Sequence, residues 1–492
     1  MPLSRAAGIL LHPTSLPGPE GIGTLGADAR RFVDFLKQAG MRLWQVLPLG
    51  PTGYADSPYA GLSAFAGNPM LIDLHGLIAH GWLRSRELSR MPSSQGSFIE
   101  YGKVIPKKMA LLRRAAQRFG SSPPPDFFSA FIDQNQHWLD DFCLFMALKD
   151  SYGGASWEHW ERSLRLREVK SVAVAAERLA EDIAFHRFVQ FVLALQWTTL
   201  KKYANEHEVS LIGDMPIFVA YDSADVWSHQ EQFQLTVDGL PEFVSGVPPD
   251  YFSRTGQLWG NPQYRWAAME NSGFTWWIER FRSLMTQVDI IRLDHFRGFA
   301  GAWWVPYGSD TAETGSWRPS AGRNMLTKVG DELGQLSVIA EDLGVITQDV
   351  VDLRLHFGWP GMKILQFAFG SDAKNSNLPH NFDRNTCVYT GTHDNDTTRG
   401  WFEALNETER SAVCRYVDSS GKDISWSLVR LAFASVADTA IVPLQDVLNL
   451  DSEARMNRPG TVEGNWRWRF SWDQLDDNQI HRLLDLVETY GR

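Results

Sequence analysis

Arg292 and Asp294 stand at the end of a run rich in apolar, β-branched residues. The run predicts a buried strand over residues 288–293 that leads into a loop. Side chains alternate between the two faces of a strand, so Arg292 and Asp294 share one face. One interpretation is a structural ion pair, because a buried charge is stable only when it is paired. The other is that the guanidinium keeps Asp294 ionised, as nucleophilic catalysis requires.

Three further acids, Asp214, Glu341 and Asp394, come at or just after the ends of other apolar runs. Most of these runs are separated by helical patterns, so they read as strands joined by helices. Eight strands are predicted in this way, at residues 8–12, 43–47, 209–214, 288–293, 336–341, 362–367, 387–390 and 440–444.

Eight strands alternating with helices, without a long break in composition, are typical of an α/β fold, the (β/α)8 TIM barrel. We expect residues 1–492 to form a single catalytic barrel with two insertions. The first, about residues 70–205, is mainly helical and follows the second strand. The other, about residues 216–286, follows the third strand and includes a lid-like loop at residues 247–262, rich in Pro, Gly and aromatic residues. The four acids would then meet at the carboxyl ends of the strands, where such barrels place their sites.

The amino-acid composition limits the kinds of binding partner that the protein is expected to have. The formal net charge is -11, and no basic run is present, which argues against nucleic acid or an anionic membrane and favours a neutral or small-molecule substrate. No obligate protein partner is evident. The 3 cysteines are too few and too far apart for a disulfide framework. The first apolar run is too short for a signal-peptide core, so we expect a cytoplasmic protein.

A glycine-rich string at residues 21–26 matches the dinucleotide-binding pattern GxGxxG. We reject that reading because the string does not begin where the preceding strand ends. The next strand, residues 43–47, also lacks the acidic residue that would bind a ribose.

A mouth lined with carboxylates is compatible with three kinds of function. Asp and Glu with His295 and His393 could bind a divalent metal, but no known metal-ligand spacing is present. Glycoside chemistry needs two carboxyl groups whose pKa values are pushed apart. A glucan-binding scaffold would need the aromatic residues but not the acids. The residues favour glycoside chemistry without excluding the other two.

A resemblance to known sequence motifs favours one of these three functions. Arg292-x-Asp294, Glu341 and His393-Asp394 resemble motifs of the α-amylase clan, in the same chain order. The longer strings are similar to the amylomaltases, the 4-α-glucanotransferases or disproportionating enzymes of that clan, and they extend from Ser15 to Arg469. These strings are SLPGPEGIGTLG, PTGYADSPYAGLSAFAGNP, GDMPIFVAYDSADVW, GVPPDYFSRTGQLWGNPQY, IRLDHFRGF, AEDLG, YTGTHDNDT and GNWRWR.

The resemblance implies roles for individual residues. Asp294 would be the nucleophile, Glu341 the general acid and base, and Asp394 the stabiliser of the transition state. Arg292 would keep Asp294 ionised, and His393 would donate to the same sugar. The remaining residues would contact neighbouring glucosyl units: Tyr59, Asp214, Asp250, Trp259, Asn465 and, at an outer site, Tyr54.

The implied activity is retaining transfer of α-1,4-glucan segments to the 4-OH of an acceptor, without metal or cofactor, and intramolecular transfer would give cyclic glucans. The substrates would be α-1,4-glucans and maltooligosaccharides. The alternative is an α-amylase-like hydrolase, which would share all three acids and differ in what reaches the glucosyl-enzyme.

Overall fold

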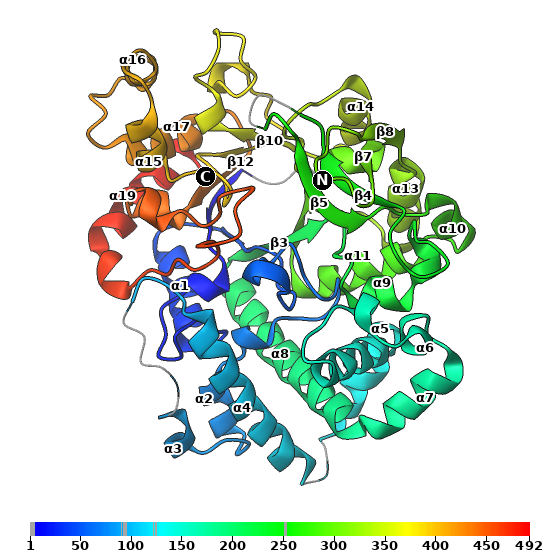
Figure 1. The fold of residues 1–492 in the computed structure, drawn as a ribbon. Coiled ribbons are helices and arrows are strands. Elements are labelled where there is room, and N and C mark those ends of the chain that lie inside the picture. The colour runs from blue at the N-terminus through cyan, green and yellow to red at the C-terminus, as the bar shows by residue number, and fades with distance from the viewer. Residues whose placement is uncertain (1–4, 90, 92–95, 122, 124, 250–252) are drawn as a thin grey trace.

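The computed structural model describes residues 5–89, 91, 96–121, 123, 125–249 and 253–492. All eight predicted strands are present, and they close into one parallel barrel whose strands follow each other in chain order (Figure 1). The barrel prediction is thus confirmed. The barrel strands are Ala6–Leu10 (β1), Leu43–Gln45 (β2), Ser210–Pro216 (β3), Ile290–Asp294 (β6), Val338–Ala340 (β9), Gly361–Ile364 (β10), Thr386–Tyr389 (β11) and Thr439–Pro443 (β12).

These strands are short, and most of their residues are buried, as expected where helices cover the outside of a barrel. At Gly213 on β3, an added Cβ would lie 2.6 Å from the side chain of Val288, so glycine allows this close approach. The pairing of β3 with β6 places Asp214 directly beside Arg292. Register alone therefore brings two of the predicted site residues together.

Helices surround the barrel and fill its first insertion, which lies between β2 and β3 and forms the lower part of Figure 1. The helices are Ala27–Gln38 (α1), Leu74–Ala79 (α2), Ser85–Leu88 (α3), Tyr101–Gly120 (α4), Asp126–Ser151 (α5), Arg162–Arg165 (α6), Val169–Arg178 (α7), Ala180–Glu206 (α8), Ala224–Ser228 (α9), Trp266–Asn271 (α10), Thr275–Gln287 (α11), Arg297–Ala300 (α12), Gly322–Leu333 (α13), Gln348–His356 (α14), Thr398–Ala404 (α15), Glu407–Val417 (α16), Ile424–Ala434 (α17), Leu444–Val447 (α18) and Asp477–Tyr490 (α19).

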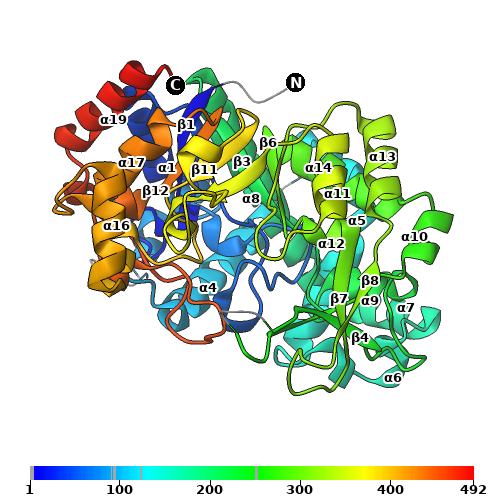
Figure 2. The ribbon, with the colours of Figure 1, turned by 90° about the horizontal axis from the view of Figure 1, so that it is seen from above.

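A second, antiparallel sheet lies to one side of the barrel, in the order β5-β4-β7-β8 (Figure 2). Its strands are Phe243–Val247 (β4), Gln257–Pro262 (β5), Gly301–Pro306 (β7) and Ser316–Pro319 (β8). The sequence did not predict this sheet. The prediction of one long loop over residues 247–262 is wrong at its end, because Gln257–Pro262 is a strand that pairs with β4. Glycine and proline in these strands resemble loop composition, and only the pairing between distant segments orders them.

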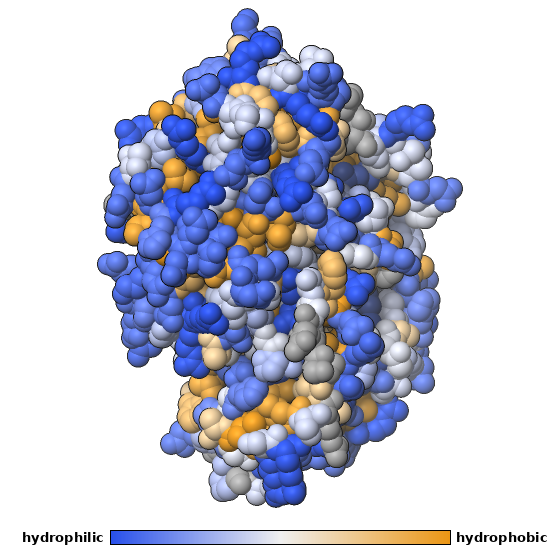
Figure 3. Space-filling view, turned by 90° about the vertical axis from the view of Figure 1, so that its left-hand side faces the viewer, coloured by the Kyte–Doolittle hydropathy of each residue, from blue (hydrophilic) through white to orange (hydrophobic). Residues whose placement is uncertain are grey.

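One hydrophobic core joins the barrel strands to the long helices of the first insertion, including Trp44, Phe145 and Phe188. A small separate cluster, Val244, Val305 and Ala312, lies on the second sheet. The face beside α1 and α19 is mainly hydrophilic, with its apolar side chains in separate patches (Figure 3). Within the described residues, no helix is both long enough and apolar enough to cross a bilayer.

Candidate active site

Arg292 lies on β6 between two carboxylates. Its Nη1 is 2.7 Å from both carboxylate oxygens of Asp214 and 2.8 Å from Oδ1 of Asp294. The side chain of Asp214 is fully buried, whereas that of Asp294 is 25% exposed. Burial lowers the pKa of Arg292, but the two carboxylates outweigh burial and raise the pKa well above its usual value. A permanently charged Arg292 therefore faces an accessible carboxylate and is held from behind by a buried one.

Tyr59, from the loop after β2, completes this group. Its hydroxyl donates a 2.6 Å hydrogen bond to Oδ2 of Asp214. Burial, followed by the charge of Asp214, raises its pKa well above the usual range, so the phenol stays a neutral donor. Its ring stacks on that of His393 with centroids 5.0 Å apart. Asp214 is thus bound by both Arg292 and Tyr59, and its role as a glucosyl contact stays a prediction.

Glu341 directly follows β9 and lies beside the segment that carries Asp294. The backbone N–H of His295 donates to its Oε2 at 2.6 Å, and that of Leu343 donates to its Oε1 at 3.2 Å. His295 adopts φ 51°, a left-handed conformation that aims its N–H at this carboxyl group. Burial, followed by the negative charge of Asp294, raises the pKa of Glu341 well above its usual value. The protonated form required of a general acid is therefore favoured.

Asp394 lies beyond the end of β11 in a different environment. Burial acts to raise its pKa, but His393, a hydrogen bond from Asn457 and the charge of Arg292 lower it to about 2. His393 Nε2 is 3.3 Å from Oδ2, and Asn457 Nδ2 donates to Oδ1 at 2.6 Å. The mouth therefore combines a carboxyl group that resists ionisation, Glu341, with one that ionises readily, Asp394.

Trp259 reaches the mouth from β5 of the second sheet. Its ring contacts that of His295 edge to face, with centroids 4.7 Å apart, and 38% of the residue is exposed. Burial lowers the pKa of His295 to about 4, so this imidazole is neutral near pH 7. An aromatic surface thus borders the residue that follows Asp294.

The other predicted contacts are placed differently. The amide of Asn465 is used inside its own loop, where it accepts from the N–H of Arg458 at 2.9 Å and donates to Thr461 at 3.0 Å. Its role as a glucan contact stays a prediction. Asp250 and the side chain of Tyr54 lie outside the described residues.

Sequence reasoning did not identify two features of the site. The pairing of Asp214 with Arg292 was not predicted; matching the ends of β3 and β6 would have revealed it. Asn457 was not singled out. Its contact with Asp394 joins residues 63 positions apart, and nothing in the local sequence indicates it.

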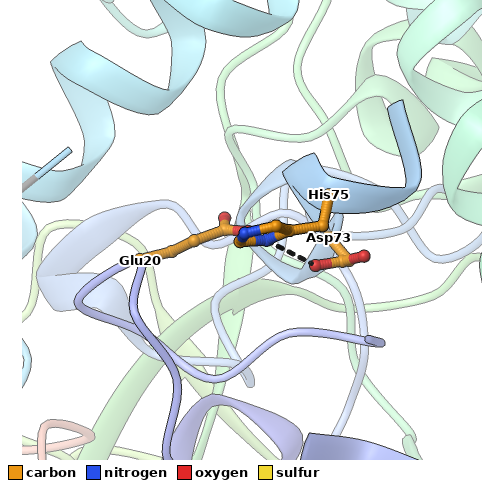
Figure 4. A group of neighbouring side chains, drawn as sticks. All are labelled: Glu20, Asp73 and His75. Carbon is orange, nitrogen blue, oxygen red and sulfur yellow. Dashed lines mark ion pairs between the residues drawn. The ribbon is translucent and has the colours of Figure 1, made fainter. Parts of the chain in front are cut away.

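Among the described residues, one group could offer three ligand atoms to a metal: Glu20, Asp73 and His75 (Figure 4). Asp294, Glu341 and Asp394 do not belong to it. Buried Lys108 already neutralises Glu20 at 2.7 Å, and Asp73 caps α2 through the N–H of Gly76. These interactions give the two acids structural roles.

Comparison with known proteins agrees with this geometry. The pattern of a family described as 4-alpha-glucanotransferase matches residues 11–475. The 4-alpha-glucanotransferase of Thermus thermophilus is 47% identical over 100% of both chains. That of Synechocystis sp. is 46% identical over 99% of this chain and 98% of its own. The amylomaltase from Streptococcus agalactiae, solved in complex with acarbose, superposes with a TM-score of 0.97 at 38% identity over 99% of each chain. The chain therefore belongs to the 4-alpha-glucanotransferase family and is a glycosyl-transferring enzyme.

Proposed function

We propose that the enzyme transfers α-1,4-glucan segments from a maltooligosaccharide or starch donor to the 4-OH of an acceptor glucan or glucose, by a double displacement on Asp294. The observation that carries this proposal is the position of Arg292 Nη1 between Asp214 and Asp294. That arrangement places an accessible carboxyl group in contact with a guanidinium and near a second carboxyl group, Glu341, whose pKa is raised. One nucleophile and one acid are the two groups that a retaining glycosidic transfer needs.

In the first half of the reaction, a carboxylate oxygen of Asp294 attacks the anomeric carbon of the donor. Glu341 gives its proton to the glycosidic oxygen, so the carbon–oxygen bond breaks and the leaving glucan ends in a free 4-OH. The result is a glucosyl ester on Asp294 and an ionised Glu341. Asp394 and His393 would bind hydroxyls of the reacting sugar and stabilise its oxocarbenium-like transition state.

In the second half, ionised Glu341 takes the proton of an acceptor 4-OH, and that oxygen attacks the anomeric carbon. The ester bond breaks and Asp294 leaves as a carboxylate, so both acids return to their starting states. Two inversions give net retention, for which a carboxyl separation of roughly 5–5.5 Å between Asp294 and Glu341 is expected.

Transfer rather than hydrolysis requires that a bound sugar outcompete water. A correctly oriented hydroxyl can act as if present at about 10⁵ M or more, far above the concentration of water. Trp259, partly exposed beside His295, would supply such orientation by stacking on an acceptor sugar. The substrates would be α-1,4-glucans, and the similar amylomaltase from Streptococcus agalactiae was solved in complex with acarbose. Intramolecular attack by the far end of a long donor would give cyclic glucans.

The proposal also covers the domain organisation of the chain, its location and its need for a cofactor. We expect one catalytic unit, because a single hydrophobic core joins barrel and insertion. A cytoplasmic location is supported by three free cysteines. Neither cofactor nor metal takes part in the steps above.

Maltotriose is the substrate that tests the reaction. The expected products are glucose and a ladder of longer maltooligosaccharides, with almost no net gain of reducing ends. A steady rise in reducing ends, without any product longer than maltotriose, would identify the hydrolase instead.

A further inference from the structure

The segment that follows β12, residues 455–458, lies along the strand-end segment that carries His393 and Asp394. Asn457 makes a hydrogen bond to each of these two residues. Its backbone N–H donates to the His393 carbonyl at 3.1 Å, and its Nδ2 donates to Asp394 Oδ1 at 2.6 Å. Arg455 adds two bonds, from Nη2 to the Asp394 carbonyl at 2.5 Å and from Nε to the Asn457 carbonyl at 2.7 Å. Backbone and side chain of Asp394 are thus both fixed from one neighbouring segment.

The same segment is anchored to the aromatic side of the mouth. The N–H of Trp466 donates to the carbonyl of buried Met456 at 2.7 Å. The ring of Trp466 lies 5.8 Å from those of both Tyr59 and His393. A shift of Asn457 would therefore also disturb the stack of Tyr59 on His393.

The hydrogen bond from Asn457 leaves the carboxylate of Asp394 able to accept further hydrogen bonds. Within the part of the chain that the structure describes, Oδ1 of Asp394 is bound by Asn457 and Oδ2 lies beside His393, and the side chain is 47% exposed. A carboxylate can accept about four hydrogen bonds, so two remain for sugar hydroxyls. The neutral amide of Asn457 holds one oxygen by donating a hydrogen bond, without adding charge.

We infer that Asn457 is a positioning residue of the transfer reaction, which orients Asp394 through its amide and keeps that carboxylate available to the reacting sugar. The inference rests on the role proposed above for Asp394. Asn457 acts through Asp394 and need not touch substrate itself.

Loss of the hydrogen bond from Asn457 to Asp394 should reduce stabilisation of the transition state more than binding of the substrate in its ground state. Asn457→Ala should therefore lower kcat about 10- to 100-fold, with a smaller change in KM. The acid limb of the pH profile of kcat should also move to higher pH in this variant, because the ionised form of Asp394 loses a hydrogen-bond donor. Among the described residues, the charged or titratable groups that face Asp394 are His393, Arg292, Tyr59 and Arg455, and all of them remain in this variant.

Asn457→Asp gives a sharper test. At neutral pH the introduced carboxylate repels Asp394, and kcat should fall further than in Asn457→Ala. In acid, the introduced side chain becomes protonated and then has the shape of asparagine and an O–H to donate, so activity should partly recover as pH falls. A residue that only supports the loop would not produce this acid-shifted optimum.

The experiment compares kcat, KM, pH profile and Tm for wild type, both Asn457 variants, Asp394→Asn and a control, Asn324→Ala. Asn324 is exposed and donates to Glu270 away from the mouth. Loss of kcat at Tm close to wild type, with the two opposite pH shifts, supports the inference. Normal kcat in Asn457→Ala, or a loss explained by lowered Tm with an unshifted pH profile, would overturn it. If Asp394→Asn were itself fully active, the proposed function would fail instead.

Discussion

The mouth is built from two regions of different character. The catalytic network, Asp214, Arg292, Asp294 and Glu341, sits on or directly after barrel strands β3, β6 and β9. The outer wall, Tyr59, Trp259 and Trp466, comes from a loop after β2, from the second sheet and from the segment after β12. The network is charged and mostly buried, whereas the wall is aromatic and, at Trp259, 38% exposed. The charged network is therefore held by the barrel strands, whereas the aromatic side chains are carried by loops and by the second sheet.

The two regions should respond differently to substitution. A buried charge that loses its partner costs several kcal/mol, about 3–5 in measured cases, so a change at buried Arg292 or Asp214 should affect folding as well as chemistry. In the wall, Trp259 is exposed and can be removed with little effect on folding, so its loss should change which acceptor reacts.

The largest effect is expected at the nucleophile. Asp294→Asn should lower turnover of maltotriose by several orders of magnitude, since an amide cannot form the glucosyl ester. Its Tm should stay near that of wild type, because Arg292 keeps Asp214 as partner. Retention of even a tenth of wild-type turnover would show that Asp294 is not the nucleophile.

Glu341→Gln should follow, with a loss of about 10²–10⁴-fold, the usual contribution of general acid–base catalysis. In wild type the acid must be protonated, so kcat/KM should fall as pH rises through the raised pKa of Glu341. Asp394, with a pKa of about 2, should stay ionised well into the acid range. A basic limb that persists unchanged in Glu341→Gln would assign that limb to another group.

Arg292→Lys tests how the charge of the network is held. One nitrogen, Nη1, makes all three contacts, so a planar fork against one carboxylate is not what the structure shows. Lysine keeps the charge, but its side chain is shorter and its ammonium group is more strongly hydrated. It should therefore contact the two carboxylates less well and be harder to bury than the guanidinium. We expect a loss of kcat smaller than that of Asp294→Asn, together with a lowered Tm. Unchanged kcat would mean that charge alone is sufficient.

Trp259→Ala should act on the wall alone, by lowering transfer more than hydrolysis. Trp317→Ala is a matched control: it is also 38% exposed, but lies on the opposite face of the same sheet, in the row of Leu258, Gly246 and Trp303. The measurement is the ratio of longer oligosaccharides to new reducing ends from maltotriose. Equal ratios in the two variants would remove Trp259 from acceptor binding.

The smallest expected effect is that of metal removal. Activity should survive exhaustive chelation, because two carboxyl groups and Arg292 suffice for the proposed steps. Lost activity that a single divalent ion restores would bring back the metal-dependent alternative.

The sequence predicted the network better than the wall. Barrel strands are buried on both faces, so they stand out as apolar runs, and the acids at their ends could be placed at one mouth from the order of residues alone. Strands β4, β5, β7 and β8 are rich in glycine, proline and tryptophan, and they exist only through pairing between distant segments. Trp259 was therefore predicted as a site residue but on a loop. Asn457 was missed because its partner is distant along the chain.

The covalent intermediate is the central claim, and trapping it is the most direct test. In Glu341→Gln, an α-maltotriosyl fluoride can transfer its sugar without acid assistance, because fluoride leaves unaided. Without the base, the ester should then break down slowly. Proteolysis and mass spectrometry of the trapped protein should place a maltotriosyl group on Asp294, and the double variant with Asp294→Asn should carry none. A sugar attached to another carboxylate, or no adduct while the donor is consumed with inversion, would contradict the double displacement.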